Sequence, residues 1–188
     1  MKATAQLDEL TLAQKLGDTP HVSPLLRKIL RMTGCSEDRI GDWLLKCAVQ
    51  RGTSHYEREF PSNLPLDNPN LSDEELGIAL CLGEHPYNST LLRAAAQLLS
   101  SPKIDAARLA RLAVMERVEP VLLYIAQAAA RFAPDAQPWA YLRAYLPARN
   151  LVSSNALPHW SRFVSQTGVT PFGGGPAIQW FCRRGSKK

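Results

Sequence analysis

The sequence lacks an apolar run long enough to span a membrane. Its longest uncharged apolar stretch, residues 120–130, is about half of the roughly 20 residues that a transmembrane helix needs. Asp8 and Glu9 stand where a secretory signal peptide would carry its apolar segment, so secretion by that route is not expected. These absences predict a soluble, cytoplasmic protein with no membrane partner.

Cysteine and histidine are scarce, and their spacing fits no zinc-binding or catalytic family. The four cysteines include no CxxC pair and have no histidine at ligand spacing. An enzyme would have to gather His55 or His159 with carboxylates in a pocket, but neither has a cysteine or serine partner at a spacing that defines a catalytic family. We therefore predict no catalytic residue, no metal and no cofactor. An enzyme is the third functional hypothesis, after two binding roles.

Acidic residues are scarce toward the carboxyl end. The chain has a net charge of +5, and residues 135–188 alone carry +6, from seven Lys or Arg and one Asp. Hydrophobic residues make up 45% and charged residues 21% of the chain, which is typical of a soluble globular protein and argues against general disorder. The concentration of positive charge at one end predicts an electrostatic contact site there.

Apolar residues at helical spacing are abundant, which predicts an all-α fold. Ser23 before Pro24 marks the start of one helix and Gly34 marks its end, while Ser72 and Glu75 form a capping box at the start of another. The predicted helix over residues 73–84 is apolar nearly all round, so we expect neighbours on several sides of it. The other helices are predicted after Asp105 and over residues 6–16, 37–51, 89–101, 121–132 and 138–146.

Residues 71–134 contain two helix pairs that superimpose at a spacing of 32 residues. The phrase Leu92-Arg93-Ala94-Ala95-Ala96-Gln97-Leu98-Leu99 resembles the second helix of a HEAT-type repeat, where a basic residue precedes small residues and leucines; residues 125–132 echo it. The resemblance implies a right-handed superhelical stack of antiparallel helix pairs. It also implies binding, since HEAT-like modules mostly bind proteins. A few relatives bind DNA, among them a class of alkyl-base glycosylases whose active site has no counterpart in this sequence.

Composition divides the chain into four predicted regions. They are an amino-terminal helical hairpin region (residues 1–60), a linker rich in proline and asparagine (61–70), a core of helix pairs (71–147) and an irregular basic tail (148–188) with a short strand at 177–182. We expect residues 1–147 to form one domain, because two pairs and a truncated third are too few for a repeat array to be stable alone.

The first functional hypothesis is non-catalytic binding of a protein partner, by the helical surface or by the tail. Arg93, Arg108 and Arg111 are predicted to form a basic stripe suited to an acidic partner, although a solvated helix face would show the same spacing. In the helix after Asp105, both arginines are expected to point outward. The residues expected to point inward are Leu109, Leu112, Ala113 and Val114.

The second hypothesis is nucleic-acid binding through the carboxyl-terminal tail, where aromatic rings would stack on bases and basic side chains would hold phosphates. The residues in question are Trp180, Phe181, Arg183, Arg184, Lys187 and Lys188. In the competing interpretation, the tail packs its aromatic rings onto the helical body and leaves its charges in water. We favour packing, and so place protein binding ahead of nucleic-acid binding.

Overall fold

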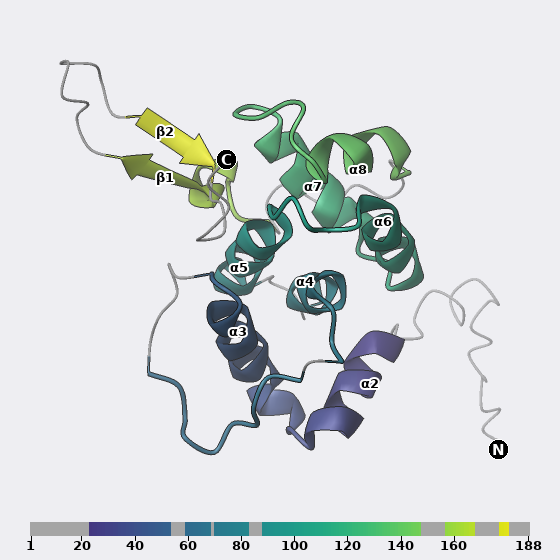
Figure 1. The fold of residues 1–188 in the computed structure, drawn as a ribbon, viewed down its shortest axis with the longest axis vertical. Coiled ribbons are helices and arrows are strands. Elements are labelled where there is room, and N and C mark those ends of the chain that lie inside the picture. Colours follow the sequence, from purple (N-terminus) through teal and green to yellow (C-terminus); the bar gives the residue numbers. More distant parts are fainter. Residues whose placement is uncertain are drawn as a thin grey trace, which may run out of the picture.

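The computed structural model describes residues 23–53, 59–68, 70–82, 88–147, 157–167 and 177–180, and these described residues contain seven α-helices (Figure 1). The helices are α2 (Pro24–Thr33), α3 (Ile40–Gln50), α4 (Asp73–Cys81), α5 (Ser89–Leu99), α6 (Ala106–Met115), α7 (Glu119–Ala129) and α8 (Trp139–Tyr145). The predicted all-α fold is confirmed. The right-handed superhelical order of a HEAT-like stack stays a prediction, and the predicted helix at residues 6–16 lies outside the described residues.

Short-range signals in the sequence position the helix ends. Ser23 Oγ accepts a hydrogen bond from the Leu26 amide (2.9 Å), and Gly34 ends α2 in the left-handed conformation (φ 64°), which glycine adopts without a steric cost. Ser72 and Glu75 form the predicted capping box, in which each side chain accepts a hydrogen bond from the backbone amide of the other residue. Within the described residues, no helix combines the length and apolar character needed to cross a bilayer.

Helix α4 lies at the centre of the bundle, with α2, α3, α5 and α6 around it (Figure 1). Eight of its nine residues are buried, which confirms the expectation of neighbours on several sides. The contact with α5 is especially close at Gly77. A Cβ added there would lie 2.5 Å from Leu99 Cδ2 and 2.6 Å from Leu99 Cγ. The absence of a side chain at Gly77 therefore permits the approach of the two helices.

Replacing Gly77 with alanine is expected to lower the free energy of unfolding by about 1–3 kcal/mol, because the methyl group overpacks a core in which Leu99 is fully buried. An alanine in a helix interior otherwise stabilises it by about 1 kcal/mol relative to glycine, so the expected sign is reversed here. Urea unfolding followed by circular dichroism measures the change. Gly41→Ala in α3 is the matched control, since its Cβ would lie 3.7 Å from Leu91 Cδ1 in ordinary contact. A Gly77→Ala variant as stable as the wild type would contradict the packing described.

The segment predicted as a linker, residues 61–70, is held against α3 and α4. Arg51 donates hydrogen bonds to both carboxylate oxygens of Asp67 (2.7 Å each) and to Asp73 Oδ1 (3.0 Å). Burial alone lowers the pKa of Arg51, but the bonds to Asp67 and Asp73 outweigh it, so the pKa is raised. Leu64 is 5% exposed and belongs to the same hydrophobic core as the helices. The segment is thus part of the packed body.

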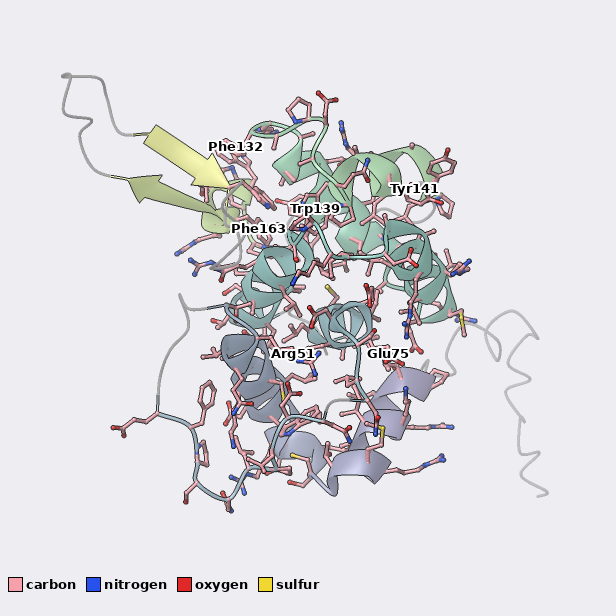
Figure 2. All side chains as sticks on the ribbon, in the orientation of Figure 1. Arg51, Glu75, Phe132, Trp139, Tyr141 and Phe163 are labelled. Carbon is pink, nitrogen blue, oxygen red and sulfur yellow. The ribbon has the colours of Figure 1, made fainter. Side chains whose placement is uncertain are left out.

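The carboxyl-terminal region packs on the helices through aromatic rings. A short 3-10 helix, η3 (Trp160–Phe163), leads into β1 (Val164–Thr167), which pairs antiparallel with β2 (Ala177–Trp180). The strand predicted at 177–182 is therefore present over 177–180, and the region predicted to be irregular contains regular elements. Figure 2 shows Phe132, Trp139 and Phe163 gathered on the side of the bundle that faces this hairpin.

The Ser100 hydroxyl links this aromatic group to α5. Its Oγ accepts hydrogen bonds from the indole N–H of Trp139 (3.1 Å) and of Trp180 (2.8 Å) and donates to the Ala96 carbonyl (2.6 Å). Trp180 stacks on Phe163 with ring centroids 5.8 Å apart. Residues from the end of α5, from α8 and from the hairpin are thereby joined at one half-buried hydroxyl, which fixes where the hairpin begins to leave the body.

Candidate functional site

Large apolar side chains are exposed mainly at one place among the described residues, the junction of α6 and α8. Four such side chains are exposed in the described part of the chain, and three of them lie here: Val114 (49%), Met115 (67%) and Tyr145 (68%). The fourth, Leu66 (81%), lies in the segment between α3 and α4. Single exposed apolar residues are normal on a surface, whereas neighbouring ones can form an apolar surface for interaction.

These side chains line an open groove of about 460 Å³, which we call the α6–α8 groove. Arg111 is the one charged residue among the six that line it. The full set is Ala110, Arg111, Val114, Met115, Tyr145 and Leu146. Such a surface can bind an apolar side chain and one anionic group, and it carries no nucleophile or general base for catalysis.

Helical geometry explains why α6 presents this face. Leu109 and Ala113, four residues apart, are fully buried, and Val114 lies about 100° further round the helix axis, where it faces outward. The expectation that Val114 points inward is therefore wrong. Arg111 lies three residues before Val114 and four before Met115, so all three share one side of the helix. On α8, Tyr145 packs against Tyr141 with ring centroids 4.3 Å apart, which holds that wall of the groove.

Two arginines of α6 are exposed, and the carboxylate that lies near one of them is buried and hydrogen-bonded. Arg108 and Arg111 are exposed, as predicted, while Glu75 (8% exposed) accepts a hydrogen bond from Lys28 (2.6 Å) and lies 3.8 Å from Arg108. Burial alone raises the pKa of Glu75, but hydrogen bonds from Lys28 and the Ser72 amide, with the charges of Lys28 and Arg108, outweigh it and lower the pKa. Figure 2 shows Glu75 between α4 and α2.

Glu116 joins the end of α6 to the start of α2. It is 4% exposed, and its carboxylate accepts hydrogen bonds from Ser23 Oγ (2.6 Å) and from the Leu25 amide (3.0 Å). A carboxylate at a helix amino terminus satisfies free amides and meets the positive end of the helix dipole. Sequence reasoning missed this contact, because the partners are about 90 residues apart.

The three arginines of the predicted stripe are not brought together. Arg93 lies on α5, is half-buried and has an Nε atom shielded from solvent. Arg108 and Arg111 lie on α6, and helix α4 stands between α5 and α6 (Figure 1). Of the predicted residues, Arg111 alone lines the groove. The apolar lining was not predicted. The sequence does contain two pairs four residues apart that include lining residues, Ala110–Val114 and Tyr141–Tyr145.

Of the six residues predicted to bind nucleic acid, only Trp180 lies among the described residues. Trp180 is 8% exposed and packed between aromatic neighbours, so its ring does not face solvent and cannot stack on a base; this fits the packing interpretation and corrects the expectation for that residue. The other five lie outside the described residues, and nucleic-acid binding through them stays a prediction. They are Phe181, Arg183, Arg184, Lys187 and Lys188.

His159 is the one histidine among the residues that the structure describes. His159 is exposed, and its Nδ1 atom lies 2.9 Å from the Ser161 hydroxyl two residues later, where it caps η3. His55 lies outside the described residues. The described residues contain no group of three or more His, Cys, Asp or Glu that could hold a metal ion.

Comparison of the chain with protein-family models, with curated proteins and with solved structures found no match. The HEAT-like resemblance of residues 71–134 therefore stays a prediction.

Proposed function

We propose that this chain binds a protein partner, without catalysis, by taking an amphipathic helix with acidic residues into the α6–α8 groove. The observation that carries the proposal is the concentration of exposed Val114, Met115 and Tyr145 at one groove beside Arg111. The free thiols of Cys35, Cys47 and Cys81 fit the cytoplasmic location that the sequence predicts.

The groove can supply the binding energy through a few anchors. Full burial of one apolar side chain is worth about 1.5–3 kcal/mol, so two anchors on Met115 and Tyr145 would support micromolar binding only with further contacts. Met115 adapts its shape to different apolar groups, because its side chain is unbranched and flexible. A partner carboxylate near Arg111 would add a charge-assisted hydrogen bond and set the direction of the helix.

A display library of helical peptides, selected on the full chain, tests this proposal. Selected peptides should carry apolar residues at i, i+3 or i+4 with acidic residues beside them. Met115→Glu should weaken their binding by about tenfold or more, because it places a carboxylate in the apolar groove and repels the partner's acidic residues. Isothermal titration calorimetry measures the affinities.

Leu66→Glu is the matched control, since it makes the same change at an exposed apolar side chain away from the groove. Its affinity for the selected peptides should equal that of the wild type. Peptides that bind Met115→Glu as tightly as the wild type, or that lose binding to both variants equally, would show that the groove is not the binding site.

A further inference from the structure

Residues 6–16 have the chemistry that the α6–α8 groove is proposed to bind. Their apolar residues recur at helical spacing, and acidic residues stand among them. The apolar residues at this spacing are Leu7, Leu10, Ala13 and Leu16, Leu12 is a further apolar residue, and the acidic ones are Asp8 and Glu9. With Lys15 as the one basic residue, the segment has a net charge of −1, opposite to that of Arg111 in the groove.

The chain enters the described fold beside the groove. Ser23 is the first described residue, and its Oγ donates a hydrogen bond to Glu116 Oε2 (2.6 Å). Glu116 directly follows Met115, whose side chain is 67% exposed in the groove. The amino-terminal segment is therefore tethered at the end of α6 that carries the exposed methionine.

The connection between Ser23 and this segment is long enough to reach the groove. Residues 17–22 span up to about 20 Å when extended, at about 3.3–3.6 Å per residue. They include Gly17 and Pro20, which end a helix and favour a turn. A helix over residues 6–16 is about 16 Å long, so it can lie along the groove after a single reversal of the chain.

We infer that residues 6–16 dock as an amphipathic helix in the α6–α8 groove of the same chain. The inference rests on the groove being a docking surface, as the proposed function requires. Leu7 and Leu10 supply the apolar anchors, and the adjacent carboxylates approach Arg111. Because a short tether gives an effective concentration in the millimolar range, a weak contact is enough for high occupancy. A partner helix must then displace this segment.

Photocrosslinking of the full chain tests the docking directly. With p-benzoylphenylalanine in place of Met115, irradiation and mass spectrometry should identify a crosslink to residues 6–16, whereas the same probe at Leu66 should not reach that segment. An equimolar mixture of isotope-labelled and unlabelled chains separates two cases. Crosslinks within one chain support the inference, and crosslinks between labelled and unlabelled chains overturn it, since the occupant would then be a second copy.

A second measurement distinguishes this inference from the proposed function. Leu10→Asp should abolish the crosslink and tighten the binding of a selected peptide by about threefold to tenfold, because the groove is no longer occupied in the free protein. Lys15→Glu, which adds negative charge to the same segment away from Leu10 and beside Asp8, is the control and should keep the crosslink.

The outcomes separate cleanly. If selected peptides bind the wild type and Leu10→Asp equally and no crosslink to residues 6–16 forms, the inference is wrong and the proposed function stands. If the crosslink forms and Leu10→Asp removes it, but no peptide is selected, the inference holds and the partner proposal fails.

Discussion

Replacing Trp139 with alanine is expected to lower the free energy of unfolding by about 3–5 kcal/mol. Trp139 is 1% exposed at the start of α8, and its indole N–H donates to Ser100 Oγ (3.1 Å). Its ring also meets Trp180 edge-on, with centroids 6.2 Å apart. Truncation leaves a large cavity where α8 packs on the body, and α8 carries Tyr145 of the groove. Equilibrium unfolding in urea, followed by circular dichroism, measures the loss.

Trp139→Phe separates the packing contribution from the hydrogen bond. The phenyl ring keeps most of the apolar volume, and Ser100 Oγ still has Trp180 and the Ala96 carbonyl as partners. We therefore expect the free energy of unfolding of this variant to be lower than that of the wild type by only about 1–2 kcal/mol. If Trp139→Ala lowered the free energy of unfolding by less than Trp139→Phe, the placement of Trp139 in the core would be contradicted.

Replacing Glu116 with alanine is expected to lower the free energy of unfolding by about 2–6 kcal/mol, since two buried donors lose their acceptor and each unsatisfied donor costs about 1–3 kcal/mol. The donors are the Ser23 hydroxyl and the Leu25 amide, at the start of α2. Besides global stability, hydrogen exchange gives a local readout. The Leu25 amide should exchange faster in the variant, because its carboxylate acceptor is gone.

Glu116→Gln is the control for the charge. The glutamine side chain retains one oxygen acceptor for the Leu25 amide and can donate to Ser23 Oγ. We therefore expect the decrease in the free energy of unfolding to be less than half of that in Glu116→Ala. If the alanine and glutamine variants both have the same midpoint of urea unfolding as the wild type, the Glu116 carboxylate does not hold α2 to α6.

The helix ends were predictable from the sequence because their determinants lie within a few residues of one another. The capping box of Ser72 and Glu75 joins residues three positions apart, and Gly34 needs only its own backbone freedom to end α2. The burial of Trp180 followed from the tendency of aromatic rings in a tail to pack. These are local or general preferences, which a single sequence contains.

The groove was not predictable, because it depends on how distant segments meet. Val114 directly follows the buried Ala113 on α6, and its outward direction depends on which side of α6 packs on α4 and α8. Tyr145 joins Met115 only through the packing of α8 on α6. The sequence shows Glu116 only as a carboxylate at the end of a helix, and its hydrogen bonds to the start of α2 depend on how the two helices pack. Sequence spacing identified Arg111 but not its apolar surroundings.

The most direct test of the central claim is methyl NMR of the full chain titrated with a selected peptide. With valine, leucine and methionine methyl groups labelled, the methyl signals of Val114, Met115 and Leu146 should shift and saturate together as peptide is added, while those of Leu66 stay in place. Saturable shifts at other methyl groups, with Val114 and Met115 unmoved, would contradict the account, because the peptide would then bind away from the α6–α8 groove.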